Sequence, residues 1–219
     1  MVKKASKPRF SLEKERQKLL LAILPYAGLY GWNEKALTAG AKEIKMNAAT
    51  ARRLFPDMPN DLLSAYAAWA DDAMTKKLSK AKLLKMKVRE RIILAVMTRL
   101  QIIAPYKAAE KKAITSIFHK RQGWLATKLL YHTVDAMWRA AGDTSSDWNF
   151  YTKRLLLAGV YTSTLVVWLN DDSKDLGMTR EFLSHRIEDV MKINKLKEGF
   201  KGLSAANDLI DMWKKRKAA

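Results

Sequence analysis

Residues 135–154 read DAMWRAAGDTSSDWNFYTKR and lie between two segments whose apolar residues recur with helical spacing. The stretch holds two tryptophans, a phenylalanine and a tyrosine beside three aspartates and three basic side chains. Its middle, GDTSS, has the residue types that form turns and cap a following helix. The stretch therefore predicts two helices, over 123–141 and 147–170, which meet at an aromatic corner.

Helical spacing continues outward from this turn towards both ends of the chain. The 219 residues include nine glycines and five prolines, and no alternating strand pattern is visible, so the sequence predicts an all-α protein. The expected helices cover 11–26, 34–44, 48–55, a segment opening at Asn60, 83–104, 105–119, 123–141, 147–170 and 179–195.

The first expected helices, a long one followed by two short ones joined by a brief turn, have a helix-turn-helix outline. The basic run from Lys76 is the natural boundary between this unit and the remainder. We expect four parts: a disordered tail at 1–10, a helix-turn-helix-like unit at 11–80, a helical domain at 83–195 and an amphipathic basic helix at 196–219.

The chain is strongly basic, with 41 Lys and Arg against 22 Asp and Glu and a net charge of +19. Such a surplus indicates a polyanionic partner, either nucleic acid or an anionic membrane, although charge runs are also common on solvated helix faces. The absence of cysteine excludes disulfides, thiolate metal sites and cysteine nucleophiles.

No group of residues has the spacing of a catalytic or metal site. His132 and Asp135 would share a helix face, but a lone histidine is more often a core residue. Glu181 and His185 form one pair at the wrong spacing for a di-iron bundle. We therefore expect a binding protein with no enzymatic activity, no metal and no cofactor other than a bound lipid.

The segment 147–170 is apolar on all sides, which predicts a helix that is buried or lines an apolar cavity. Its uncharged part, 155–169, is fifteen residues long, whereas a bilayer span takes about 20 residues, so we expect a soluble or peripheral protein. The candidate residues for lining a lipid pocket, which could equally be plain core, are Leu129, Leu155, Leu156, Val160 and Leu165.

A family resemblance rests on several stretches. TVDAMWRAAGDTSSDWNFYTKRLLLAGVYTSTLVVWLNDDS with FLSHRIEDVMK closely resembles the C-terminal domain of the ubiquinone-biosynthesis COQ9 family. LYGWNEKALTAGAKE, LFPDMPNDLLSAYAAWAD and KVRERI are similar to the N-terminal part of its bacterial members. The resemblance covers nearly the whole chain.

The resemblance implies a TetR-regulator-like fold with a helix-turn-helix unit and a helical ligand domain that forms a homodimer. It also implies a protein without activity of its own, which binds isoprenoid lipids or phospholipid and supports the di-iron demethoxyubiquinone hydroxylase. The partner-facing patch of the family corresponds here to Met137, Phe150 and Tyr151, followed by Arg154. Family members often carry tryptophan where Phe150 stands, so a hydrogen bond from an indole is lost.

The last segment is amphipathic and basic, and family members carry a membrane-binding helix there. We expect the protein to be peripheral on the inner face of a bacterial membrane, or on the matrix side in a mitochondrion. The candidate membrane-binding residues are Phe200, Lys201, Leu203, Ile210, Trp213, Lys214, Lys215 and Arg216.

Two other functions fit the sequence less well. A DNA-binding transcriptional regulator of the TetR type would use Arg52 and Arg53 on its recognition helix. Against this, Asp57 and two prolines stand where such regulators usually have a phosphate-contacting tyrosine and lysine. A lipid-responsive chaperone unconnected with ubiquinone is the third possibility.

Overall fold

The computed structural model describes residues 9–79, 83–119, 123–144 and 148–192, and within these ranges all regular structure is helical. The predicted all-α class is therefore confirmed for the described part of the chain. The helices are α1 Arg9–Tyr30, α2 Glu34–Glu43, α3 Ala48–Leu54, α4 Asn60–Ser79, α5 Val88–Ile103, α6 Lys107–His119, α7 Gly123–Ala140, α8 Trp148–Leu169 and a last helix over 177–192.

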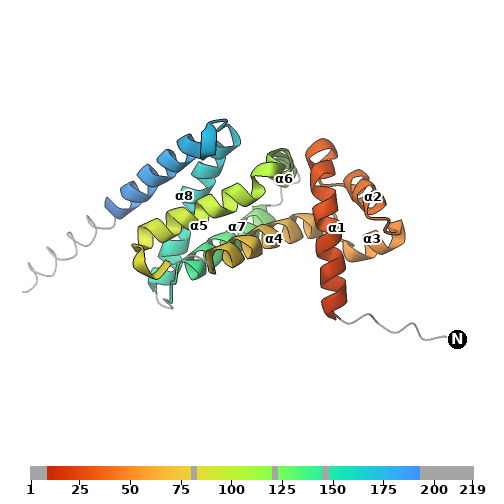
Figure 1. The fold of residues 1–219 in the computed structure, drawn as a ribbon, viewed down its shortest axis with the longest axis horizontal. Coiled ribbons are helices and arrows are strands. Elements are labelled where there is room, and N and C mark those ends of the chain that lie inside the picture. The colour runs from red at the N-terminus through yellow and green to blue at the C-terminus, as the bar shows by residue number, and fades with distance from the viewer. Residues whose placement is uncertain (1–8, 80–82, 120–122, 145–147, 193–219) are drawn as a thin grey trace, which may run out of the picture.

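Helices α1 to α3 form a three-helix unit at one end of the molecule (Figure 1). The two short helices begin where expected, because the side chain of Asn33 accepts hydrogen bonds from the backbone of α2 and that of Asn47 does the same for α3. Helix α1 is longer than the predicted 11–26. It continues through Pro25 and Gly28 to Tyr30 and ends at Gly31, which has a positive φ of 82°.

Helices α1 and α2 cross with their backbones in close approach at Gly40. A Cβ atom on Gly40 would lie 2.7 Å from Cγ1 of Ile23 and 2.9 Å from its backbone nitrogen. Real side chains do not occupy such positions, so the crossing requires glycine although glycine weakens a helix interior.

We expect Gly40→Ala to lower the free energy of unfolding by about 1–3 kcal/mol, because the added methyl overpacks the crossing. The matched control is Gly159→Ala on α8, where no atom of the described part of the chain lies within 4 Å of the added Cβ. The control should be neutral or stabilising by up to about 1 kcal/mol, since alanine is the better helix former. Urea denaturation measures both variants, and equal stability of the two would contradict the close crossing.

The remaining helices pack around a second part of the core. Helix α4 packs on α5 and α7, α7 packs on α8, and α6 reaches back to contact α1. Figure 1 shows α5 and the helix over 177–192 beside α8 at the end away from α2 and α3. Helix α4 thus connects the three-helix unit to the rest.

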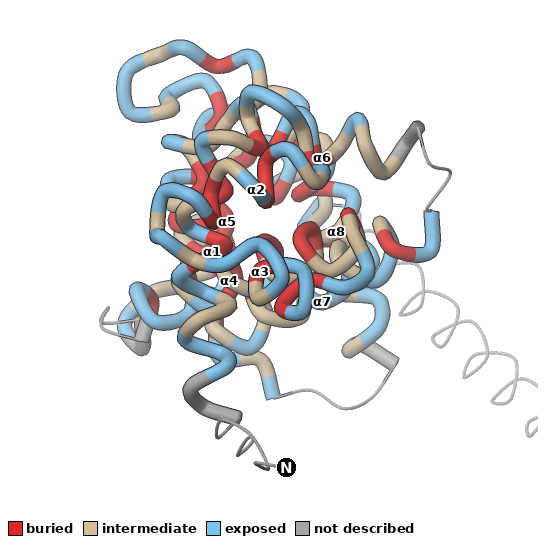
Figure 2. Tube along the Cα trace, turned by 90° about the vertical axis from the view of Figure 1, so that its right-hand side faces the viewer, coloured by how far each residue is buried: buried red, intermediate tan, exposed pale blue. Residues whose placement is uncertain are grey.

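One continuous hydrophobic core extends through both parts of the molecule. Its largest fully buried side chains include Trp168 on α8, Phe55 after α3 and Ile23 on α1. The indole Nε1 of Trp32 donates to the carbonyl oxygen of Ala109 at 2.9 Å, which links the three-helix unit to α6. Figure 2 shows the buried segments of several helices turned towards the middle of the molecule.

One described stretch, Val88–Ile117, is long and apolar enough to cross a membrane by length and composition alone. Half of its most apolar window is buried within the fold, and core helices pass the same test. The stretch is also interrupted by the 3-10 turn Ala104–Tyr106 between α5 and α6.

Candidate functional site

A cavity of about 550 Å³ lies among α4, α5, α6, α7 and α8. Its walls are mainly apolar, with Leu63 from α4, Ile114 and Ile117 from α6, Leu129 from α7 and Leu165 from α8. Pockets of 300–1,000 Å³ with apolar walls and a few polar groups are typical of small-molecule sites. A second hollow of about 590 Å³, between α1 and α4, is lined largely by charged and polar side chains.

The inner end of the cavity is formed by buried polar side chains around Arg99. Nε of Arg99 donates to Oδ1 of Asp71 at 2.7 Å, and its Nη1 donates to the hydroxyl of Tyr161. The hydroxyl of Thr133 donates to the same carboxylate at 3.0 Å. Arg99 is only 4% exposed, so the ion pair with Asp71 is shielded from solvent and each partner depends on the other.

Glu110 and Tyr66 complete the polar end of the cavity. Glu110 is 8% exposed, and burial raises the pKa of its carboxyl although the nearby charge of Arg99 opposes this. The Tyr66 hydroxyl is fully buried and has no well-formed hydrogen bond to any of the described residues. Burial and the neighbouring Glu110 carboxyl raise the pKa of Tyr66, so this hydroxyl keeps its proton.

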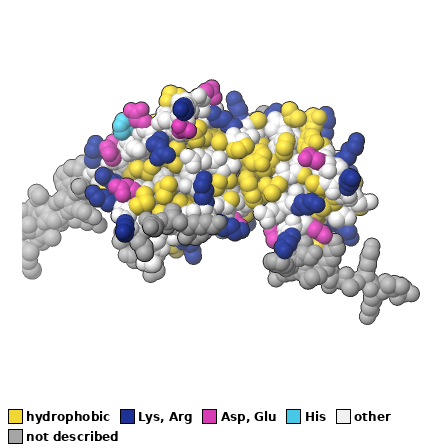
Figure 3. Space-filling model, viewed as in Figure 1, with side chains coloured by type: hydrophobic (Ala, Val, Ile, Leu, Met, Phe, Trp, Pro, Cys, Tyr) yellow, Lys and Arg dark blue, Asp and Glu magenta, His cyan; other side chains and the backbone are white. Residues whose placement is uncertain are grey.

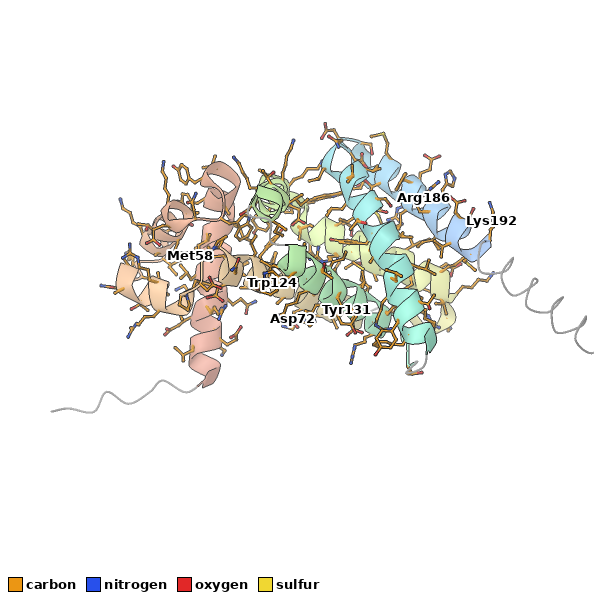
Figure 4. The ribbon with its side chains drawn as sticks, turned by 180° about the vertical axis from the view of Figure 1, so that it is seen from behind. Met58, Asp72, Trp124, Tyr131, Arg186 and Lys192 are labelled. Carbon is orange, nitrogen blue, oxygen red and sulfur yellow. The ribbon has the colours of Figure 1, made fainter. Side chains whose placement is uncertain are left out.

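The opposite end of the cavity reaches the molecular surface where α7 begins. The lining residues Gly123, Thr162 and Val166 are exposed there, in contrast to the buried residues of the polar end. Trp124 is 63% exposed beside this opening. Figure 4 shows Trp124 and Tyr131 along α7, on the face of the molecule where α8 also lies.

The structure places two of the five predicted pocket residues, Leu129 and Leu165, in the wall of this cavity. Leu155, Leu156 and Val160 do not line it, and for these three the predicted placement is wrong. Leu155 is 76% exposed, Leu156 is half-buried and Val160 belongs to the core. Helix α8 is apolar all round because one side faces the core, a second side faces the cavity and a third is exposed.

The aromatic corner between α7 and α8 is built around a buried arginine. Arg154 is 3% exposed and its Nη2 lies 2.6 Å from Oδ1 of Asp135. Its Nη1 lies 3.2 Å from Oδ2 of Asp143 and donates to the carbonyl oxygen of Phe150 at 3.1 Å. The guanidinium also stacks over the ring of Phe150, 3.3 Å from its centre. Charge pairing therefore fixes the start of α8 against the end of α7.

This arrangement corrects the predicted partner-facing patch. Met137 is fully buried in the core, and Arg154 is buried by its two carboxylates, so neither presents its side chain at the surface. Tyr151 is 63% exposed and its ring packs edge-on against that of Phe150, with centres 5.1 Å apart. Leu155 stands one turn further along α8, and we call Phe150, Tyr151 and Leu155 the corner surface.

Trp138 is half-buried against the core, and its Nε1 donates to the carbonyl oxygen of Lys153 at 3.1 Å. In the three-helix unit, Arg52 of α3 forms an ion pair with Glu34 of α2 rather than standing free.

Lys and Arg side chains are spread over the face drawn in Figure 3, while apolar side chains gather towards its middle. The predicted membrane-binding residues, from Phe200 to Arg216, lie outside the described residues.

The polar end of the cavity was missed by sequence reasoning. Asp71 and Glu110 stand next to other charged residues, where a solvated position is the ordinary expectation. Tyr66 is placed on the apolar stripe of its helix by helical spacing, which gives no sign that its hydroxyl would be buried. The available signal was a charged residue at a core-facing position, visible for Arg99 between Ala95, Val96 and Ile103.

Comparison with known proteins gives one family and one fold. The COQ9 family model matches residues 125–194. The ubiquinone biosynthesis protein COQ9-B, mitochondrial, of Xenopus laevis is 34% identical over 196 residues, which cover 86% of this chain and 67% of that protein. The ubiquinone biosynthesis protein COQ9, mitochondrial, of Homo sapiens is 30% identical over 190 residues, 84% of this chain and 59% of that protein. The chain thus spans about two thirds or less of the length of these relatives.

Solved structures with a similar fold are TetR transcriptional regulators. One from Nitrosomonas europaea has a TM-score of 0.66 at 22% identity and covers 80% of this chain and 97% of the regulator. One from Rhodococcus sp. RHA1 has a TM-score of 0.60 at 15% identity, with 83% and 96% covered. At these identities the likeness shows the fold alone, and it confirms the predicted TetR-like architecture.

Proposed function

The chain belongs to the COQ9 family, and from this premise we propose that it is a lipid-binding accessory protein of ubiquinone biosynthesis, without catalytic activity of its own. The observation that supports the proposal is the cavity of about 550 Å³ with apolar walls, a polar inner end and an opening beside Trp124. Each methylene of a lipid tail buried in such a cavity contributes about 0.8 kcal/mol.

Native mass spectrometry of the purified protein, followed by lipid extraction, tests this function. We expect a bound isoprenoid lipid or phospholipid in the wild-type protein and a homodimer in the same spectrum. Ala126→Phe, on the cavity wall, should remove most of the bound lipid because its ring fills the space. Thr127→Phe, one residue further and exposed, is the matched control. Extraction of no lipid from the wild-type protein would contradict the proposal.

We further propose that the corner surface docks the di-iron demethoxyubiquinone hydroxylase. Tyr151 and Leu155 are large side chains with apolar surface, one helical turn apart and both mostly exposed, and contiguous exposed apolar surface marks interaction sites. Aromatic residues held by a rigid frame are typical interface anchors. The frame here is the ion-paired Arg154 beneath Phe150.

For Tyr151→Ala we expect at least about thirtyfold weaker binding to the hydroxylase, equivalent to roughly 2 kcal/mol for an interface anchor. The thermal midpoint should hardly change, because Tyr151 is mostly exposed within the chain. Tyr131→Ala on α7, another exposed tyrosine, is the control and should bind as the wild type does. Unfolding of the Tyr151 variant would show that the ring belongs to the core.

We also propose peripheral membrane attachment through the segment from Phe200 to Arg216. Basic residues near anionic lipid contribute about 1 kcal/mol each, and apolar residues on the same helix add burial. In flotation with cardiolipin-containing vesicles, the full chain should float and a chain ending at Asn194 should remain at the bottom. Equal flotation of both would place the membrane contact elsewhere.

A further inference from the structure

The Tyr66 hydroxyl at the inner end of the cavity is buried and has no well-formed hydrogen bond among the described residues. Its polar neighbour is the carboxyl of Glu110, which contributes to the raised pKa of Tyr66. Both side chains are more than nine-tenths buried, and both line the cavity. Buried polar groups are nearly always paired, because an unpaired one keeps the cost of losing water without a compensating bond. A buried hydroxyl without a well-formed hydrogen bond, beside a buried carboxyl at the end of an apolar cavity, indicates a ligand group that completes this polar end.

The electrostatics of this end disfavour a phosphate. The charge of Arg99 is already balanced by Asp71, with their atoms 2.7 Å apart. Glu110 adds either no charge or a negative one, and burial favours its neutral form. The described lining residues include neither lysine nor histidine. A phosphorylated head would therefore meet no surplus of positive charge.

The available hydrogen-bond chemistry is that of O–H groups. The Tyr66 hydroxyl and a protonated Glu110 carboxyl can each donate, and the carboxyl can also accept. The Tyr161 hydroxyl accepts from Arg99, which leaves its own proton for an acceptor. These groups suit a head with a hydroxyl or carbonyl oxygen.

We propose that the inner end of the cavity binds the uncharged, oxygen-bearing head of an amphipathic lipid and disfavours a phosphate at that end, so that a bound phospholipid would keep its phosphate at the opening. The head oxygen bonds to Glu110 and Tyr66, and the tail follows Ile114, Leu129 and Leu165 towards the opening. This inference rests on the lipid-binding function proposed above and adds the orientation and the head chemistry of the ligand.

The test uses three ligands with the same branched fifteen-carbon skeleton: farnesol, farnesyl phosphate and the saturated hydrocarbon farnesane. Their affinities are measured on the full chain by displacement of Nile red, a neutral apolar dye. We expect farnesol to bind about fivefold or more tightly than farnesane, the effect of at least one net hydrogen bond, and farnesyl phosphate to bind weakest. Tighter binding of farnesyl phosphate than of farnesol would overturn the proposal.

Substitutions of Tyr66 and Glu110 test whether the head of the ligand binds at the inner end of the cavity. Tyr66→Phe removes only the hydroxyl and Glu110→Met removes the carboxyl, so each should weaken farnesol about fivefold and leave farnesane unchanged. Glu110→Gln keeps a neutral donor and acceptor and should stay within about twofold of the wild type. Tyr131→Phe makes the same chemical change as Tyr66→Phe outside the cavity and should have no effect.

The outcomes separate this inference from the function on which it rests. If no tail displaces the dye, the lipid-binding function itself fails. If farnesol and farnesane bind equally and Tyr66→Phe changes neither, the lipid function stands and head recognition at this end is wrong. Loss of farnesol binding in Glu110→Gln as large as that in Glu110→Met would mean that an ionised carboxylate accepts from the farnesol hydroxyl, which still supports an uncharged head because a carboxylate repels a phosphate.

Discussion

Replacing Asp71 with leucine is expected to lower the free energy of unfolding by about 3–5 kcal/mol, the cost of leaving a buried charge without its partner. Arg99 is 4% exposed and would keep its charge, since a guanidinium is not deprotonated in proteins. Its Nε would lose the carboxylate that now lies at 2.7 Å. Thr133 would lose the same acceptor.

Urea denaturation at neutral pH measures this effect. The double variant Asp71→Leu with Arg99→Met should recover much of the loss, because replacing a buried ion pair by apolar side chains of similar volume is often neutral. The control for removing a carboxylate from α4 is Asp72→Leu, since Asp72 pairs with Lys76 at the surface and such pairs contribute about 0–1 kcal/mol. A loss below about 1 kcal/mol for Asp71→Leu would mean that Arg99 is hydrated in the folded protein.

The helices were largely predictable from the sequence because local signals determine them. Asn33 and Asn47 cap the helices that follow them, as their side-chain chemistry requires. The end of α1 was not predictable, because tertiary contacts override weak helix formers. Gly28 in α1 packs against Ala108 of α6. A Cβ atom on Gly28 would lie 3.2 Å from Cβ of Ala108, and this close contact favours glycine within the helix.

The polar end of the cavity depends on contacts that no local pattern contains. Asp71 and Arg99 are 28 residues apart, and Asp71 and Thr133 are 62 residues apart. Helical spacing places each residue on a face of its own helix, but the partner across the core follows only from how the helices are packed. The same limit explains Leu155, because periodicity cannot tell an exposed apolar face from a cavity wall.

Helix α7 connects the two candidate sites. Thr133 bonds to Asp71 at the inner end of the cavity, and Asp135, two residues later, pairs with Arg154 beneath the corner surface. Met137 lies between Asp135 and the turn that follows α7, and it is fully buried. This part of the helix therefore has little freedom to shift. A bound lipid and a docked partner would therefore be linked through one rigid element, helix α7.

The second large effect is expected for Arg154→Met, which should lower the free energy of unfolding by about 3–5 kcal/mol and also weaken hydroxylase binding. The side chain of Asp143 is 6% exposed and that of Asp135 is 16% exposed, so both carboxylates would lose a shielded partner. The ring of Phe150 would lose the guanidinium that stacks on it. Phe150 and Tyr151 would then no longer be held in one orientation.

Arg139→Met is the matched control for Arg154→Met. Arg139 also pairs with Asp135, at 2.7 Å, but its side chain is 69% exposed, so its loss should cost no more than about 0.5 kcal/mol. Denaturation and hydroxylase binding are measured on both variants and compared with Tyr151→Ala. If Arg154→Met kept wild-type stability but lost binding, Arg154 would contact the partner directly and the buried ion pairs would not be what fixes the corner. Loss of both properties in Arg154→Met, beside loss of binding alone in Tyr151→Ala, would separate the residue that holds the surface from the residue that makes the contact.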